Sequence, residues 1–170
     1  GYNTDGKGFL LMLEGAGITV RGKSVLVLGA GGAGRSTAAA LKAAGARVLL
    51  YRRNRRLLKE ACEELGVEAA ESVVPCDIFI NCTGVGMHES TGQSPVAGEE
   101  LNQCLTAVDL IYRPAESEFL RLARERGKKT LSGGAMLFYQ AYFSDCLYLG
   151  RKECAEEAKA LYAEYLQRTQ

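Results

Sequence analysis

The chain has 170 residues, the usual size of one domain, so the sequence predicts a single folded unit. Hydrophobic residues make up 47% of it and charged residues 24%, a composition that excludes a disordered segment, a collagen-like array and a membrane bundle. With 21 Lys plus Arg against 20 Asp plus Glu, the net charge of +1 creates no general field for nucleic acid or an anionic membrane. Any anion must therefore be bound locally.

Apolar runs bounded by turn residues alternate with segments of helical periodicity, a pattern that predicts strands joined by crossover helices. Thr4 or Asp5 is expected to cap a first helix that ends near Gly15 and Gly17. Strands are expected at residues 24–28, 47–51, 67–70, 77–82, 106–111 and 128–131. Further helices are expected at residues 32–44, 55–65, 116–126, 133–149 and 152–167. The pattern favours an α/β fold with a mainly parallel sheet.

Two features of the chain limit its environment and its chemistry. The six cysteines lie far apart without a CxxC pair, and His88 is the single histidine, so no metal site is expected. Buried free thiols in a reducing cytosol are the simplest interpretation. No stretch reaches the roughly 18 apolar residues of a membrane span, and residues 1–8 are too polar for a signal peptide. We expect a cytoplasmic protein that binds neither nucleic acid nor a membrane.

A glycine-rich turn follows the first predicted strand. Gly29, Gly31 and Gly34 have the spacing G-x-G-x-x-G at the point where an apolar strand gives way to a helix, and this context strengthens an otherwise weak motif. The glycines permit a tight turn, close approach of the backbone to a pyrophosphate, and close packing of helix on strand. A turn without a ligand is the alternative, but packing alone does not require three glycines at these offsets. A P-loop is excluded because Arg35 follows where lysine is required.

The residues after the second predicted strand indicate which dinucleotide this turn binds. An NAD site usually has Asp or Glu about 20 residues beyond the glycines, whereas a 2′-phosphate requires arginine there. Here the sequence is Tyr51-Arg52-Arg53-Asn54-Arg55-Arg56, with four arginines and no acid. A solvated helix start is one alternative, although positive charge opposes the helix dipole there. A nucleic-acid patch is another, which the near-neutral chain disfavours. The cluster favours NADP over other phosphate ligands.

Five motifs in order give the chain a resemblance to the nucleotide-binding part of the shikimate/quinate dehydrogenase family. They lie at residues 3–9, 29–33, 52–56, 81–87, and 109–114 followed by 133–140. The resemblance runs from residue 1 to about residue 150, and the motifs are specific together. It implies a doubly wound Rossmann-type fold over 1–170, a single NADP-binding domain. The family's N-terminal substrate domain, with its catalytic lysine, is absent from this chain, which begins like the middle of something longer.

The resemblance implies roles for matching residues. Asp5 matches the family's catalytic aspartate; by itself it would be interpreted as a helix cap. Substrate contacts are implied for Asn3, Asp5, Tyr112 and Gln140. Cofactor contacts are implied for Gly29, Ala30, Gly31, Gly32, Ala33, Arg52, Arg53, Asn54, Arg56, Thr83, Leu110, Gly133 and Met136. Because Tyr51-Arg52-Arg53 departs from the family's Asn-Arg-Thr, which arginine holds the 2′-phosphate stays open. Lys7 occupies a variable position and cannot replace the missing lysine.

The implied activity is the NADP-dependent interconversion of 3-dehydroshikimate and shikimate, an oxidoreduction in aromatic amino-acid biosynthesis. The substrate, a small molecule, would be shared with the missing N-terminal domain, so the chain alone is expected to be inactive. Two alternatives remain: a quinate/shikimate dehydrogenase paralogue, and a stand-alone NADP-binding module without catalysis. A Rossmann fold by itself does not separate them, because it serves many chemistries.

Overall fold

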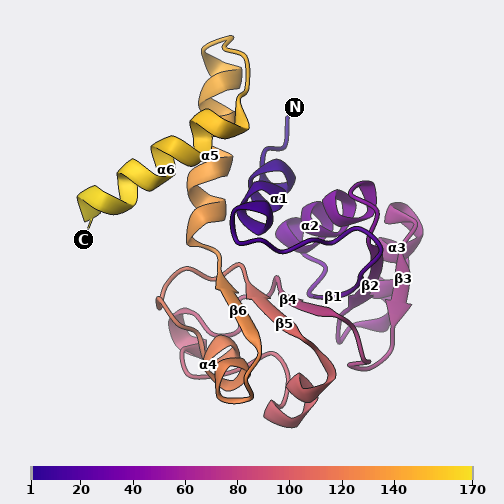
Figure 1. Ribbon diagram of the computed structural model, residues 1–170. Coiled ribbons are helices and arrows are strands. Elements are labelled where there is room, and N and C mark those ends of the chain that lie inside the picture. Colours follow the sequence, from indigo (N-terminus) through magenta and orange to yellow (C-terminus); the bar gives the residue numbers. More distant parts are fainter. Residues whose placement is uncertain (1, 170) are drawn as a thin grey trace.

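Six parallel strands form the centre of the computed structural model, which describes residues 2–169 (Figure 1). They are β1 (Ser24–Leu28), β2 (Arg47–Tyr51), β3 (Glu68–Ala70), β4 (Ile78–Asn81), β5 (Thr106–Asp109) and β6 (Lys129–Ser132). The order in the sheet is β3-β2-β1-β4-β5-β6, and neighbouring strands pair in parallel. This doubly wound order confirms the predicted Rossmann fold class. Residue 1, where the resemblance begins, lies outside the described residues.

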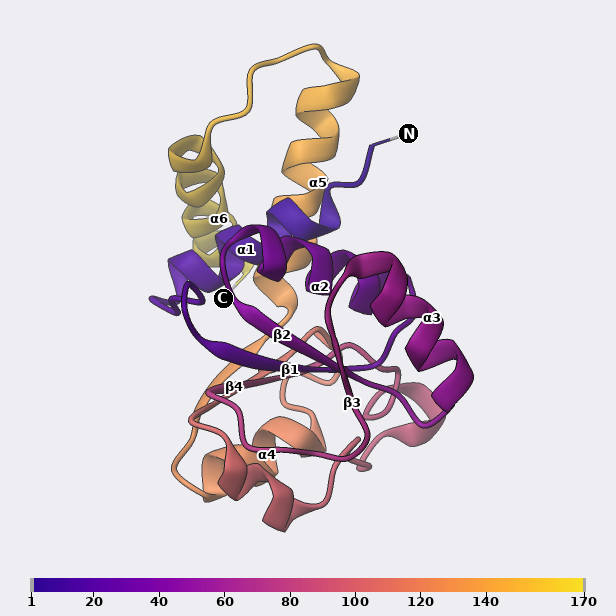
Figure 2. The same cartoon turned by 90° about the vertical axis from the view of Figure 1, so that its right-hand side faces the viewer.

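Helices cover both faces of the sheet (Figure 2). They are α1 (Asp5–Gly15), α2 (Gly32–Ala43), α3 (Arg55–Leu65), α4 (Glu118–Glu125), α5 (Gly134–Tyr148) and α6 (Ala155–Thr169), with 3₁₀ turns η1 (His88–Ser90) and η2 (Gly98–Gln103). Successive side chains of a strand point to opposite faces, so Val25 and Val27 of β1 join the core under α1, α2, α3 and α5. Leu26 and Leu28 join the second core, under α4 and η2. Both faces of the sheet are therefore buried, as the apolar strands predicted.

Capping interactions explain where several elements begin. Asn54 Oδ1 accepts a hydrogen bond from the N–H of Leu57 at 3.1 Å, and α3 therefore starts at residue 55, as expected. Thr4 occupies the N-cap position of α1, as expected, but within residues 2–169 its side chain makes no capping hydrogen bond. The Thr4 hydroxyl instead lies 2.9 Å from the Ser144 hydroxyl on α5, and Asn3 Oδ1 accepts from the N–H of Asp5 at 2.9 Å. The segment before the helix thus supplies the cap, and Thr4 holds α1 against α5.

The last two helices form a hairpin that packs against α1. Lys7 Nζ lies 2.7 Å from a carboxylate oxygen of Glu153 in the hairpin loop, and Lys159 Nζ lies 2.6 Å from Glu14 Oε1. On α6, Ala158 is fully buried. No helix within residues 2–169 combines the length and apolar character needed to span a bilayer.

Candidate functional site

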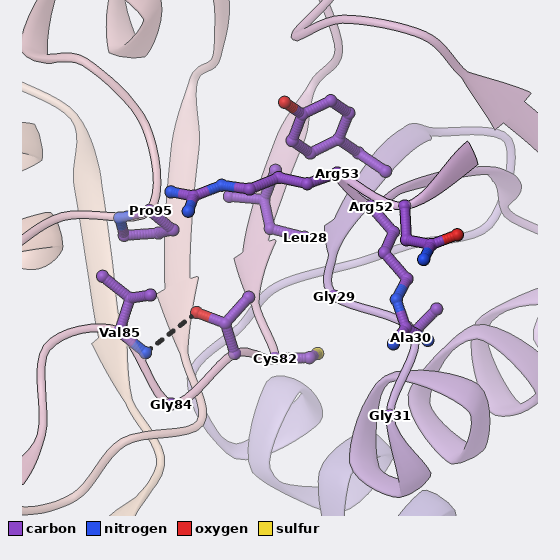
Figure 3. Close-up of a pocket in the computed structure, with 13 residues that line it drawn as sticks. Leu28, Gly29, Ala30, Gly31, Arg52, Arg53, Cys82, Gly84, Val85 and Pro95 are labelled. Carbon is purple, nitrogen blue, oxygen red and sulfur yellow. Dashed lines mark hydrogen bonds between the residues drawn. The ribbon is translucent and has the colours of Figure 1, made fainter. Parts of the chain in front are cut away.

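A pocket of about 520 Å³ opens at the carboxyl ends of β1, β2 and β4 (Figure 3). Its walls are Leu28, Gly29, Ala30, Gly31, Tyr51, Arg52, Arg53, Asn54, Cys82, Thr83, Gly84, Val85 and Pro95. The sheet order reverses here, since β1 has β2 on one side and β4 on the other. In open α/β sheets, ligands bind outside the carboxyl ends of the strands at this switch point. The pocket therefore lies where the fold places a ligand.

The glycine-rich turn forms the floor of this first pocket, and its glycines have different roles. Gly29 has φ +103°, and an added Cβ would lie 2.9 Å from Thr83 Cγ2, so this position requires glycine. A Cβ on Gly34 would overlap the carbonyl oxygen of Gly29, which shows how closely α2 packs on the turn. Gly31 is different, because its backbone is extended and a Cβ there would meet no atom within 4 Å. Packing thus explains the glycines at residues 29 and 34 but gives no reason for a glycine at residue 31.

The start of α2 adds an electrostatic preference for anions. No side chain caps this helix, whose N-cap residue is Gly31, so its first N–H groups are open to the pocket side of the turn. Aligned peptide dipoles place the equivalent of about half a positive charge at a helix N-terminus. Of the residues that the structure describes, no Asp or Glu lines the pocket. The floor of the pocket is therefore suited to a phosphate group.

The arginine cluster divides into two pairs. Arg52 and Arg53 line the pocket, and within residues 2–169 neither guanidinium has an ion-pair partner. Figure 3 shows the Arg52 side chain pointing toward Ala30 and the Arg53 side chain extending toward Pro95. The other pair lies on α3, with Arg55 bound to Glu71 at 3.3 Å and Arg56 to Glu60 at 3.6 Å.

Cys82 and Thr83 contribute the wall from the end of β4. Burial raises the pKa of the Cys82 thiol to about 12, so it stays neutral and is not a nucleophile at physiological pH. The Thr83 hydroxyl accepts a hydrogen bond from the N–H of Val85 at 3.1 Å, marked by the dashed line in Figure 3. The wall is therefore an ordered segment.

A second pocket, of about 280 Å³, lies beyond the start of α2. Its lining residues are Asp5, Ala33, Leu110, Tyr112, Gly133, Met136, Leu137 and Gln140. The structure thus brings together three of the four residues expected to contact substrate and four of those expected to contact the cofactor. A Cβ on Gly133 would overlap the carbonyl oxygen of Leu110, so close packing of α5 on the end of β5 builds this wall.

Three of the expected residues line neither pocket. Asn3 Oδ1 accepts hydrogen bonds from the N–H of Asp5 and, at 3.2 Å, from the Ser36 hydroxyl. Asn3 therefore holds Asp5, which lines the second pocket, without lining that pocket itself. Gly32 is the first residue of α2, and Arg56 is paired with Glu60.

Six lining residues of the first pocket were not predicted from the sequence. Two of them, Leu28 and Tyr51, are the last residues of β1 and β2. Cys82 and Gly84 flank Thr83, and Val85 and Pro95 belong to the same loop after β4. The Gly-, Ser-, Thr- and Pro-rich composition of residues 83–96 is typical of a functional loop, and this was the available signal.

Comparisons with known proteins agree with this geometry. A family model described as the NAD binding domain of D-isomer specific 2-hydroxyacid dehydrogenase matches residues 10–89. The shikimate dehydrogenase (NADP(+)) of Methanosarcina acetivorans is 36% identical, with 98% of this chain and 64% of the relative aligned. A shikimate dehydrogenase (NADP(+)) of Thermus thermophilus is 41% identical, over 88% of this chain and 57% of the relative.

Solved structures show the same similarity. Shikimate 5-dehydrogenase from Thermus thermophilus, in complex with NADP(H) and shikimate, superposes with a TM-score of 0.84 at 36% identity, covering 94% of this chain and 61% of that one. A chorismate mutase/shikimate 5-dehydrogenase fusion protein from Clostridium acetobutylicum gives a TM-score of 0.85 at 34% identity, covering 98% and 64%.

The strand order, the glycine-rich turn and the pocket at the switch point define a Rossmann-type dinucleotide-binding domain. Within that class, the chain is similar over most of its length to shikimate dehydrogenases. It spans 64% and 57% of the length of the two curated relatives described above.

Proposed function

We propose that the chain is the NADP-binding half of a shikimate dehydrogenase. The observation that carries this proposal is the position of Arg52 and Arg53 in the pocket beside the glycine-rich turn. Among residues 2–169, neither guanidinium has an ion-pair partner and no Asp or Glu lines this pocket. A ribose 2′-phosphate matches that charge, and a carboxylate that would repel it is missing from the lining. The names of the relatives and the NADP(H) in one related structure support the same cofactor.

The two pockets fit the parts of such a cofactor. The pyrophosphate would lie on the turn formed by Gly29, Ala30, Gly31, Gly32 and Ala33, at the N-terminus of α2. The 2′-phosphate would contact Arg52 and Arg53, with Asn54 beside them and Arg56 within the same cluster. Thr83 would flank the ribose. Leu110, Gly133 and Met136 would enclose the nicotinamide in the second pocket, to which Ala33 connects the turn.

The polar residues of the second pocket would handle the substrate. When bound, the cofactor accepts or supplies the hydride. Asp5, Tyr112 and Gln140 would hydrogen-bond the hydroxyl groups of the substrate ring, and Asn3 would keep the start of α1 in place. Asp5 would also act in the proton transfer, beside a lysine from a substrate domain outside this chain. Lys7 is engaged with Glu153, which supports the view that it does not take the lysine's place.

Cofactor binding tests the first half of the proposal. Titration calorimetry of the chain with NADP and with NAD should show tighter binding of NADP, with a dissociation constant on the order of micromolar. Equal affinities for the two nucleotides would contradict the assignment of the arginine pair.

Turnover tests the second half and separates the dehydrogenase from a stand-alone binding module. The formation of NADPH from shikimate is followed by absorbance, first with this chain and then with a protein that also carries the substrate domain. We expect no activity from the chain alone, because positioning of the substrate supplies roughly 7 to 11 kcal/mol of barrier reduction. Activity of the longer protein that is lost on Asp5→Ala would support the proposal, and parallel assays with quinate would identify a paralogue. Turnover by the isolated chain would refute it.

A further inference from the structure

A buried polar pair joins the carboxyl ends of β4 and β5 behind the first pocket. Asn81 and Asp109 are register partners on these strands, and both side chains are fully buried. Asn81 Nδ2 donates to Asp109 Oδ1 at 3.1 Å. The same carboxylate accepts from the N–H of Ile111 at 2.9 Å and, through Oδ2, from the Ser117 hydroxyl at 2.5 Å. Neither residue lines a pocket described above, so neither is placed to contact a ligand there.

The remaining hydrogen bonds of Asn81 go to the pocket wall. Its Oδ1 accepts from the N–H of Thr83 at 2.9 Å and from the Thr83 hydroxyl at 2.7 Å, and Nδ2 also donates to the carbonyl of Val85 at 3.2 Å. Thr83 and Val85 both line the first pocket. An amide has one accepting and one donating end, and Asp109 can only accept from Asn81 when ionised. Asp109 therefore determines which end of the amide faces Thr83.

The position of Thr83 matters because it touches the glycine-rich turn. Its methyl carbon occupies the space next to Gly29, where an added Cβ would come within 2.9 Å. A shift of Thr83 therefore changes both the wall and the floor of the pocket. A purely stabilising role would not require this arrangement, since apolar side chains of similar size often replace a buried polar pair without loss of stability.

We propose that Asn81 and Asp109 are a positioning pair for the nucleotide site. Asp109 orients the amide of Asn81, and Asn81 holds residues 83–85 in the conformation that completes the pocket. This inference rests on the proposed function, because nucleotide affinity is its readout. The wall is not specific for the 2′-phosphate, so loss of the pair should weaken NADP and NAD by the same factor.

The test compares variants at the two ends of the network by calorimetry and thermal unfolding. Asn81→Ala and Asp109→Ala should each weaken both nucleotides by roughly tenfold or more. Asn81→Ala removes the hydrogen bonds to the wall, and Asp109→Ala removes the group that orients the Asn81 amide toward it. Asp109→Asn should restore most of the affinity lost in Asp109→Ala, since its amide can still accept from Asn81 and donate to Ser117. Ser117→Ala is the matched control. It removes a bond to Asp109 and the cap of α4, so it should lower the melting temperature while changing affinity by less than about twofold.

Amide hydrogen exchange provides a direct readout of the wall. The N–H groups of Thr83 and Val85 should exchange faster in Asn81→Ala and Asp109→Ala but not in Ser117→Ala. If Asn81→Ala does not fold, the comparison of the two Asp109 variants decides. Equal loss of affinity in Asn81→Ala and Ser117→Ala at equal loss of stability would overturn the inference. A wild-type chain that binds neither nucleotide would refute the proposed function and this inference with it, whereas normal binding by the Asn81 variant would refute the inference alone.

Discussion

Replacement of Arg52 by alanine should sharply reduce the preference for NADP over NAD. Arg52 is half-buried in the wall of the first pocket and points toward the glycine-rich turn (Figure 3). Within residues 2–169 it has no carboxylate partner, so no ion pair must be broken before it contacts a phosphate. A hydrogen bond to a charged group contributes about 1.5 to 3 kcal/mol. Since about 1.4 kcal/mol corresponds to a factor of ten, we expect NADP affinity to fall by roughly tenfold to 150-fold.

The assay is titration calorimetry with both nucleotides at one ionic strength, because long-range charge effects change with salt. NAD has a hydroxyl in place of the 2′-phosphate, so its affinity should change by less than about threefold. Arg55→Ala is the matched control. This substitution removes the same charge from the same cluster. Arg55, however, lies on α3, where its exposed guanidinium pairs with Glu71. The reasoning is refuted if Arg52→Ala weakens NAD as much as NADP, or if Arg55→Ala has the same effect as Arg52→Ala.

Three other changes separate binding from stability. Gly31→Val should abolish nucleotide binding in calorimetry while the domain still unfolds cooperatively, because a Cβ at residue 31 meets no atom within 4 Å. Gly34→Ala should destabilise the domain by about 1 to 3 kcal/mol in denaturant unfolding, because its Cβ overlaps the Gly29 carbonyl; unchanged stability would contradict this packing. Asp109→Asn should change the pH dependence of stability. Burial raises the pKa of Asp109 above the roughly 3.9 of an unfolded chain, so the wild type loses stability relative to the variant as pH rises from about 4 through the folded pKa. A difference in unfolding free energy that stays constant between about pH 4 and pH 8 would exclude this.

The arginine cluster shows which features of the site the sequence could predict and which it could not. Its composition predicted a phosphate site, yet the residues that face the pocket are determined by where α3 begins. Because Asn54 caps that helix, Arg52 and Arg53 lie in the loop before it, whereas Arg55 and Arg56 lie on the helix beside acidic partners. Local sequence patterns predict both the cap and the helix, so the separation of the loop arginines from the helix arginines is predictable from the sequence. The ion pair between Arg55 and Glu71 could not be predicted, because Glu71 follows β3 and comes near Arg55 only when the chain is folded.

The loop after β4 was less predictable for a physical reason. Strands and helices follow from periodic burial, which a sequence displays directly. The path of residues 83–85 depends instead on hydrogen bonds to a buried side chain, Asn81, whose own partner Asp109 is 28 residues away. No local pattern encodes such a contact. Thr83 was assigned from the family resemblance, whereas Val85 and Pro95 became visible only in the fold.

The exposure of the second pocket bears on catalysis. The first pocket lies at the carboxyl ends of three strands of the same sheet, so the glycine-rich turn and the arginine pair both come from this chain. The second pocket has an open rim, where the side chains of Tyr112 and Leu137 are 47% and 46% exposed. Water in an open site weakens the electrostatic contacts that Asp5 would make in catalysis. An exposed tyrosine and leucine beside a catalytic candidate are what a facing domain would cover. The open rim therefore supports the proposal that this chain binds cofactor by itself and turns over substrate only when a second domain closes the pocket.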